Sequence, residues 1–224
     1  MKVFIGYDPR QPVAFQVCAQ SAWEHASKPI EIIRLELSKL PIKRRGLTEF
    51  TYSRFLVPYL SKFEGSSLFL DSDILVRGDL VELFESCIVP FCGVRMVQHE
   101  RAFERPSVML FNNPLCRALT PEFIEREKLF DFKWTVRGTQ EEGKVNMGGL
   151  PKEWNHLVGY DAPNPDAKIV HFTMGIPVWK ETVNSEFSKE WIDTFRRMTS
   201  TVSFDELMGR SVHVPHLSKL ASIA

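Results

Sequence analysis

The chain has 224 residues, of which 44% are hydrophobic and 25% charged, as is usual for a globular protein with a full-sized core. Its 28 basic and 28 acidic residues balance, so no net field draws it to nucleic acid or an anionic membrane. Its apolar stretches are too short to span a bilayer, which predicts no transmembrane segment. Met1 leads directly into a strand-like segment, so we expect a cytoplasmic protein without a signal peptide. The apolar surroundings of the four cysteines favour buried free thiols: Cys18, Cys87, Cys92 and Cys116.

The first forty residues predict a strand, a helix and a second strand, at residues 2–6, 12–25 and 30–37. This order implies two parallel strands joined by a right-handed crossover. Ligands of such sheets bind at the carboxyl ends of the strands, where Tyr7 and Asp8 stand. An aromatic ring and a carboxylate at this place could hold a nucleobase and a ribose, or could simply form a turn.

Residues 51–60 predict a helix that Pro58 kinks or ends. Arg54 is a charge within this otherwise apolar segment. Its side chain either extends to solvent or reaches toward the carboxylates of the strand that follows.

Two aspartates, Asp71 and Asp73, follow the apolar strand at residues 67–70 and precede a second apolar run at 74–76. An aspartate at a strand end is costly to bury unless it is paired or bound to a metal. Taken alone, this D-x-D sequence fits an ordinary turn as well as a cation site.

The rest of the chain continues the α/β alternation. The expected elements are a helix from Leu80, strands at 89–97 and 108–111, a helix from Thr120 to Phe130, a strand at 168–172, a loop at 173–179 and a helix at 185–198. Residues 203–206 have the form of a capping box, which predicts a short final helix. Residues 131–160 are expected to be irregular, and long irregular stretches are usually functional.

Asp71, Asp73 and His171 are the best metal ligands in the sequence, all at or near predicted strand ends. Two carboxylates and one imidazole leave positions open for ligand oxygens, which suits Mn²⁺ or Mg²⁺ and favours Mn²⁺. Such a cation stabilises the charge that develops on a departing diphosphate. By itself, His171 would be an ordinary core histidine.

Several stretches occur in the order of a known family. They are the strand ending in Tyr7-Asp8, Thr51 to Arg54, the D-x-D segment 69–84, Gln140, Leu150 to Asn155, and His171 to Trp179. Across residues 1–180 the chain resembles the family 8 glycosyltransferases, which include glycogenin and the bacterial galactosyltransferases of lipooligosaccharide synthesis.

The resemblance implies an α/β, nucleotide-sugar-binding fold of the GT-A type, in a single domain with a mostly parallel central sheet flanked by helices. Residues 1 to about 110 would bind the nucleotide, and residues from about 111 to 224 would form the acceptor side and the C-terminal helices. The implied activity is the metal-dependent, retaining transfer of a hexose from a UDP-sugar to a hydroxyl of a saccharide or another acceptor. The implied donor is UDP-glucose or UDP-galactose. The leaving phosphate would help to deprotonate the acceptor in a same-face transfer.

The resemblance also implies roles for individual residues. It places Mn²⁺, with Mg²⁺ as the alternative, on Asp71, Asp73 and His171. Tyr7 and Asp8 would bind the uridine, and Arg54 the donor sugar or diphosphate. Ser72 and Gly175 would belong to the substrate site, with Lys180 as a nearby cation. Gln140 would lie beside the anomeric carbon, and Gln140 and Arg54 would be the catalytic residues.

Three positions depart from the family pattern. Thr139 stands where many relatives carry aspartate, Ile176 where they often carry lysine, and residues 105–107 replace N-S-G. Lys180 would have to replace the missing lysine. These departures leave open a catalytically impaired protein that binds a nucleotide sugar or another protein. A nucleotidyltransferase would need a triphosphate loop after the first strand, which residues 7–12 do not provide.

Overall fold

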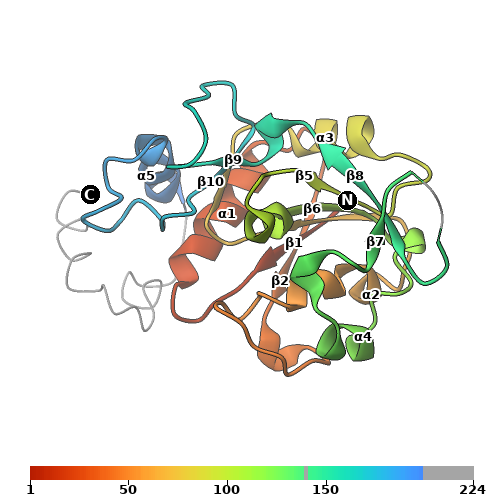
Figure 1. The fold of residues 1–224 in the computed structure, drawn as a ribbon. Coiled ribbons are helices and arrows are strands. Elements are labelled where there is room, and N and C mark those ends of the chain that lie inside the picture. The colour runs from red at the N-terminus through yellow and green to blue at the C-terminus, as the bar shows by residue number, and fades with distance from the viewer. Residues whose placement is uncertain (139–140, 199–224) are drawn as a thin grey trace.

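A computed structural model describes residues 1–138 and 141–198. Its centre is a seven-stranded sheet with the order β2-β1-β3-β6-β5-β8-β7 (Figure 1). The strands are β1 (Lys2–Gly6), β2 (Glu31–Leu35), β3 (Ser66–Leu70), β5 (Val94–Val97), β6 (Val108–Asn112), β7 (Thr135–Val136) and β8 (Val145–Leu150). Only β6 runs antiparallel to its neighbours within this sheet, and the other pairs are parallel. The expected mostly parallel α/β fold is confirmed.

A small second sheet has the order β4-β10-β9. It consists of β4 (Ile74–Val76), β9 (His156–Leu157) and β10 (Ile169–His171). Strand β10 is antiparallel to β4 and parallel to β9. The chain therefore passes from the large sheet into the small one across Asp71, Ser72 and Asp73.

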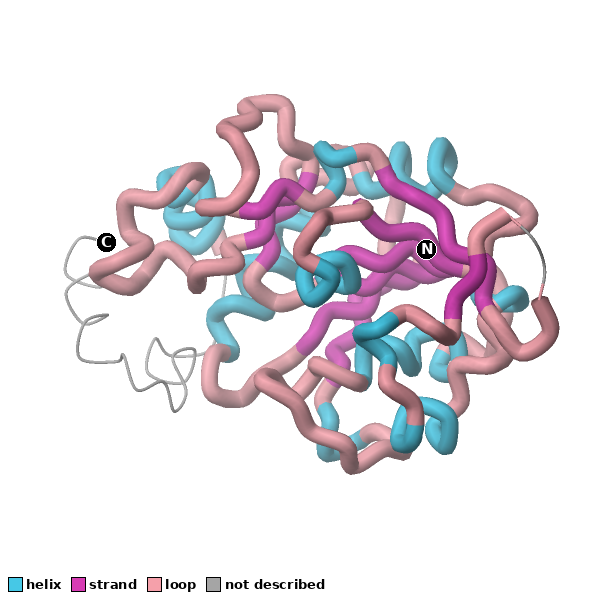
Figure 2. Tube along the Cα trace, in the orientation of Figure 1, coloured by secondary structure: helices cyan, strands magenta, loops and turns pink. Residues whose placement is uncertain are grey.

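Helices cover both faces of the large sheet (Figure 2). They are α1 (Pro12–Glu24), α2 (Val57–Leu60), α3 (Leu80–Cys87), α4 (Pro121–Arg126) and α5 (Ser188–Arg197). Apolar side chains of α1 and α3 pack on one face, those of α2 and α4 belong to the core on the other face, and α5 packs against the small sheet.

Alternation along the central strands explains the two cores. Leu68 and Leu70 of β3 contact the core beneath α1 and α3, whereas Phe69 between them enters the opposite core. The same alternation holds in β1 and β6, because successive strand side chains point to opposite faces. Because a central strand is buried on both faces, its successive residues are apolar, as at residues 68–70.

Side-chain caps explain where helices α3 and α4 begin. Asp79 caps α3 by accepting a hydrogen bond from the Val81 backbone N–H at 2.9 Å, and Thr120 caps α4 by accepting from Phe123 at 3.3 Å. Helix α4 ends at Arg126, earlier than expected, and residues Leu129–Asp131 form a separate 3₁₀ turn.

Three expectations about elements are wrong. Residues 89–93 are not strand, because β5 begins at Val94. Residues 51–60 form a 3₁₀ segment, Ser53–Leu56, followed by the short α2 rather than one helix. The stretch 131–160, expected to be irregular, contains β7, β8 and β9. The helix expected at 203–206 lies outside the described residues.

The four cysteines are free and buried, as expected. Among residues 1–138 and 141–198, no helix is long and apolar enough to cross a membrane.

Candidate functional site

Asp71, Asp73 and His171 converge where the two sheets meet. Each offers one ligand atom, and these atoms lie within 4.8 Å of one another. The His171 Nε2 atom is 3.3 Å from Asp73 Oδ1. The three residues predicted as metal ligands are thus brought together by the fold.

Strand pairing explains this convergence. In the antiparallel ladder of β4 and β10, His171 stands opposite Ile74, the residue after Asp73. The Phe172 backbone N–H extends the ladder by donating to the Asp73 carbonyl at 3.0 Å. The pairing register therefore sets the distance between the imidazole and the second aspartate.

Asp71 is enclosed from several sides. Its backbone N–H donates to the Ser107 carbonyl at 2.9 Å, which places the 3₁₀ segment Ala102–Ser107 over the site. The Cys18 thiol of α1 lies 3.6 Å from the Asp71 carbonyl oxygen. Asp71 and the neighbouring Ser72 are both buried.

Arg54 reaches the carboxylates. Its Nη2 atom lies 3.1 Å from Asp71 Oδ1, and its Nη1 atom donates to the Pro106 carbonyl at 3.0 Å. The residue is only 3% exposed, so the alternative in which it extends to solvent is wrong. The guanidinium also lies over the ring of Phe69, 5.2 Å from its centroid.

Burial and neighbouring charges shift the pKa values of Asp71 and His171. Burial raises the pKa of Asp71 to about 7, since the lowering by Arg54 is smaller and Asp73 raises it further. Burial by itself lowers the pKa of His171, but the attraction of the nearby carboxylates, led by Asp73, outweighs burial and raises it. A divalent cation at this point would stabilise the ionised form of Asp71 against the effect of burial.

Three buried atoms of the cluster lack a hydrogen-bond partner among the described residues: Asp71 Oδ1, Asp73 Oδ1 and His171 Nδ1. A buried polar atom without a partner costs about 1–3 kcal/mol. Both carboxylate oxygens make only ion-pair contacts, to Arg54 and His171, and keep lone pairs of the kind that Mn²⁺ and Mg²⁺ accept. The residues present therefore fit a divalent cation.

Tyr7 and Asp8 follow β1 at the same edge of the sheet. The Tyr7 ring is half-buried between Phe15, in an edge contact at 5.6 Å, and the guanidinium of Arg34, 4.6 Å from the ring centroid. Asp8 is buried and bound by Arg10, whose Nη2 lies 2.6 Å from Oδ2 and whose Nε lies 2.9 Å from Oδ1. Burial raises the pKa of Asp8, but the hydrogen bonds from Arg10 outweigh it and lower the pKa overall. The carboxylate is therefore ionised and already paired.

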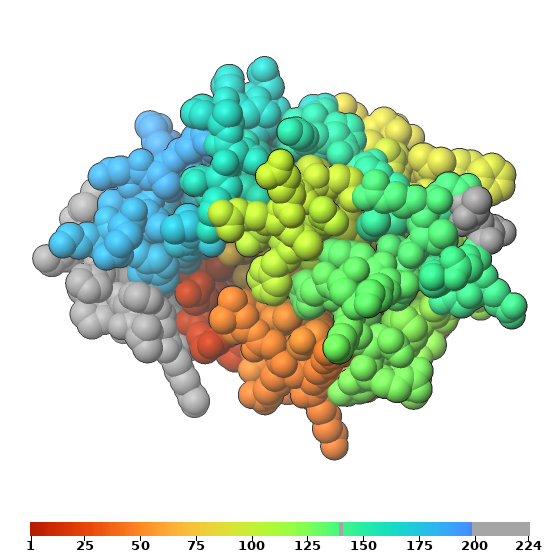
Figure 3. Space-filling view, in the orientation of Figure 1, coloured from red at the N-terminus to blue at the C-terminus, as the bar shows by residue number. Residues whose placement is uncertain are grey.

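Segments that are distant in sequence meet on the face of the molecule that Figure 3 shows. In the space-filling view, red atoms of the N-terminal region lie in a recess between the orange, yellow-green and blue segments (Figure 3).

The segment after β10 turns sharply at Gly175. This residue has φ +105°, and its N–H donates to the Phe172 carbonyl at 2.8 Å. Ile176 is buried in the core around the small sheet, whereas Lys180 is exposed. A lysine at position 176 would thus meet an apolar core in this chain.

We expect Gly175→Ala to destabilise the protein by about 2 kcal/mol, because φ is left-handed and the new Cβ would lie 3.1 Å from Trp179 Cδ1. In a chain of this length this corresponds to a melting temperature lower by roughly 4–8 °C, measured by calorimetry. Gly65→Ala is the matched control, since Gly65 has φ +60° with nothing within 4 Å of the new Cβ. Equal losses in the two variants would contradict the role of the Trp179 contact.

A hollow of about 240 Å³ lies beside the end of β5. It is lined by Gln98, His99, Glu100, Arg101, Lys152, Leu157, Tyr160 and Asp161. The Arg101 guanidinium lies 3.9 Å from the centroid of the Tyr160 ring. His99 Nε2 donates to the Asn155 carbonyl at 2.8 Å and forms the buried wall of this hollow.

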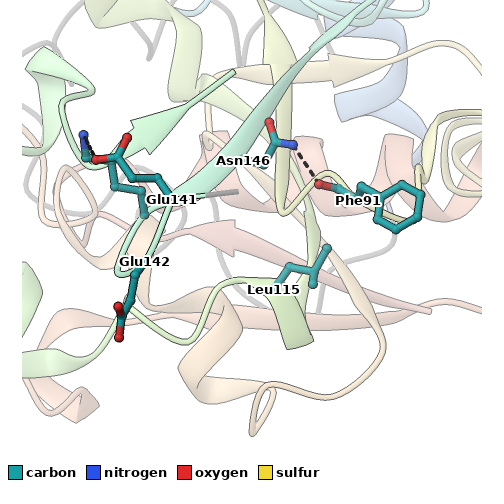
Figure 4. Close-up of a pocket in the computed structure, with 6 residues that line it drawn as sticks. Phe91, Leu115, Glu141, Glu142 and Asn146 are labelled. Carbon is teal, nitrogen blue, oxygen red and sulfur yellow. Dashed lines mark hydrogen bonds and ion pairs between the residues drawn. The ribbon is translucent and has the colours of Figure 1, made fainter. Parts of the chain in front are cut away.

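A second hollow, of about 310 Å³, lies at the opposite end of the sheet, before the amino ends of β5 and β8 (Figure 4). On one side of it the Asn146 side chain donates to the Phe91 carbonyl at 2.9 Å, and Glu141 pairs with Lys144 at 2.7 Å. The predicted site residues that the structure describes do not line this hollow.

Sequence reasoning missed Glu104, whose Oε2 lies 3.9 Å from His171 Nδ1, and Asn155, whose Nδ2 donates to Ser107 Oγ at 2.9 Å. It also missed the pairing of Arg10 with Asp8, for which the close spacing of the two residues was a usable signal. Glu104 had no such signal, because it lies far from His171 in the sequence and in a segment without helix or strand periodicity. Gln140 and Thr139 lie outside the described residues.

No family model matches the chain. Protein CDI of Arabidopsis thaliana is 31% identical over 229 residues, which cover 86% of this chain and 85% of that protein. The chain belongs to the family of Protein CDI.

This member of the CDI family is also 24% identical over 208 residues to glycosyltransferase GlyE of Streptococcus pneumoniae, where it spans about half (49%) of the relative's length. The solved structure of GlyE has a TM-score of 0.60 at 18% identity. The match covers 99% of this chain and 63% of the GlyE chain. The galactosyltransferase LgtC, solved with donor and acceptor sugar analogs, has a TM-score of 0.58 at 14% identity, with 94% of this chain covering all of that chain. The CDI-family chain therefore has the glycosyltransferase fold, and the resemblance to family 8 glycosyltransferases is confirmed.

Proposed function

We propose that this chain is a metal-dependent, retaining glycosyltransferase that moves a hexose from a UDP-sugar to a hydroxyl of a saccharide or another acceptor. The observation that carries the proposal is the buried cluster of Asp71, Asp73 and His171 at the carboxyl edge of β3. The shared fold supports it, since LgtC was solved with donor and acceptor sugar analogs in place.

The cation site would be held by Asp71, Asp73 and His171, with Mn²⁺ as the preferred ion and Mg²⁺ as the alternative. When bound, the cation supplies Lewis-acid stabilisation of the negative charge on the leaving diphosphate. Arg54 lies against Asp71 and is the nearest guanidinium for the donor sugar or its phosphates.

The uridine would lie at the end of β1, against the ring of Tyr7 and within reach of Asp8. Because Arg10 already binds both oxygens of Asp8, this exposed arginine would shift or share the carboxylate when the donor binds. Ser72 and Gly175 would contact the donor from the strand end and the turn. Lys180, exposed beyond Ile176, is proposed as the cation that replaces the missing lysine.

The acceptor would occupy the hollow beside β5. Tyr160 presents a partly exposed ring, and Gln98, Lys152 and Asp161 present polar groups suited to sugar hydroxyls. Residues 1 to about 110 would thus bind the nucleotide, and residues from about 111 to 224 would include most of the acceptor side. Gln140, outside the described residues, is proposed beside the anomeric carbon.

In the proposed reaction, the bond between the anomeric carbon and the diphosphate oxygen breaks, and a bond from the same face to the acceptor oxygen forms. Because the new bond forms on the face that the diphosphate leaves, the sugar keeps its anomeric configuration. The acceptor proton passes to the departing diphosphate, and UDP is released. The chain's own residues orient the donor and exclude water, with Arg54 and Gln140 closest to the reacting atoms.

Screening UDP-glucose, UDP-galactose and their N-acetyl forms, with water and a panel of saccharides as acceptors, tests the proposal. We expect UDP release from at least one donor in Mn²⁺, suppressed when EDTA removes the ion. A protein that neither binds UDP in the presence of Mn²⁺ nor cleaves any of the four donors would contradict it.

A second function is a nucleotide-sugar-binding or interaction protein with impaired catalysis. It is favoured by Ile176, which is 1% exposed and part of the core at a position where relatives often carry lysine. Tight UDP-sugar binding without turnover on every acceptor would support this function, and robust turnover on any acceptor would exclude it.

A further inference from the structure

His171 lies between two carboxylates, one facing each nitrogen of its ring. Its Nε2 atom is 3.3 Å from Asp73 Oδ1, and its Nδ1 atom is 3.9 Å from Glu104 Oε2. The His171 side chain is 4% exposed and that of Glu104 is 20% exposed, so both are largely removed from water. We propose that Glu104 is a positioning residue that accepts a hydrogen bond from His171 Nδ1 and holds Nε2 toward the cation. This inference rests on the proposed metal site.

The Nδ1 atom of His171 lacks a hydrogen bond that Glu104 can supply. This atom is buried and has no hydrogen-bond partner in the described part of the chain. Leaving such an atom unpaired costs about 1–3 kcal/mol, which favours a small closure of the gap. A hydrogen bond of ordinary length requires Glu104 Oε2 to approach by roughly 1 Å, which rotation of its side chain can supply.

The backbone of Glu104 is held in place by hydrogen bonds. Its N–H donates to the Arg101 carbonyl at 3.1 Å. Its carbonyl accepts from Ser107 Oγ at 2.6 Å and from Asn155 Nδ2 at 3.3 Å. Ser107 in turn accepts the backbone N–H of Asp71 through its own carbonyl, so the segment that carries Glu104 is bound to the metal site.

A carboxylate behind a metal-bound histidine has a known effect on how the histidine binds the metal. A neutral imidazole that binds through Nε2 carries its proton on Nδ1, and a carboxylate there sets the tautomer, the ring orientation and the ligand's basicity. Glu104 is not part of the group whose ligand atoms lie within 4.8 Å of one another. Its effect on the cation therefore passes through His171.

The test measures Mn²⁺ affinity directly, through the loss of the electron paramagnetic resonance signal of free Mn²⁺ on binding. Glu104→Gln keeps the side-chain shape and removes the charge. We expect its dissociation constant for Mn²⁺ to rise about 10–100-fold, the range seen when a carboxylate behind a metal-bound histidine is lost. The matched control is Glu122→Gln, which removes the same charge at an exposed position on α4 and should bind Mn²⁺ as the wild type does.

A double-mutant cycle separates positioning from simple charge attraction. In a His171→Ala background, Glu104→Gln should have no further effect on Mn²⁺ affinity, whereas a direct charge effect would persist and overturn the inference. Glu104→Asp keeps the charge but withdraws the carboxylate by one methylene, so we expect it to weaken binding too. Far-UV circular dichroism confirms the fold of each variant.

The readout distinguishes this inference from the proposed function. Wild-type protein that binds Mn²⁺, with Glu104→Gln and Glu104→Asp unchanged, would overturn only the positioning role. Wild-type protein that binds no Mn²⁺ would overturn the metal site and the positioning role together. Neither result depends on whether a sugar is transferred.

Discussion

Asp73→Asn is expected to lower Mn²⁺-dependent cleavage of the preferred UDP-hexose by about 10²–10⁴-fold. The reason is that a Lewis-acid cation contributes several kcal/mol to charge stabilisation in the transition state, and each 1.4 kcal/mol corresponds to a factor of ten in rate. Asp73 is the more accessible of the two aspartates, with a side chain 31% exposed against 10% for Asp71, so it is the more open of the two to an incoming cation. Initial rates of UDP release at saturating donor measure the effect, and a Mn²⁺ titration measures the lost affinity.

Asp166→Asn is the matched control for this variant. It makes the same chemical change at an exposed residue shortly before β10 and should retain wild-type turnover. An Asp73→Asn protein that is folded by circular dichroism and turns over at the wild-type rate would remove Asp73 from the metal site.

Arg54→Met is expected to destabilise the metal-free protein by about 3 kcal/mol, the usual result of removing one partner of a buried ion pair. The guanidinium lies 3.1 Å from Asp71 Oδ1 and 3.0 Å from the Pro106 carbonyl, and methionine replaces neither contact. For a chain of this length the expected fall in melting temperature is roughly 6–12 °C by calorimetry.

Saturating Mn²⁺ should restore part of that loss, because a cation beside Asp71 replaces the missing positive charge. The rise in melting temperature on adding Mn²⁺ should therefore be larger for Arg54→Met than for the wild type. Arg45→Met removes the same charge from an exposed pair with Glu49 and serves as the control. A fall for Arg54→Met no larger than for Arg45→Met would show that the buried pair contributes little.

The elements predicted with success are those with a strong local signal. Residues 67–70 form a continuous apolar run and become the central strand β3, and residues 12–24 carry apolar side chains at helical spacing and become α1. Helices that begin at Leu80 and Pro121 follow Asp79 and Thr120, whose side chains cap them. In these places local chemistry and burial agree.

The elements that were missed depend on partners elsewhere in the chain. β7 and β9 are only two residues long, and β8 contains the consecutive glycines Gly148 and Gly149. Such segments have little preference for strand by themselves. They become strands because β8 pairs with β5 and β7, and β9 pairs with β10.

The sequence alone was enough to nominate Asp71, Asp73 and His171, because these metal-binding side chains stand at or near predicted strand ends within an ordered set of stretches that resembles a known family. It was also enough to predict a mostly parallel α/β fold and the buried state of the cysteines. Only the tertiary structure decided that His171 lies beside Asp73, since this follows from the register of β10 against β4. The tertiary structure alone also brought Arg54 to Asp71 and Glu104 to His171. These contacts join segments far apart in the chain, and their geometry depends on backbone pairing that no local pattern of residues encodes.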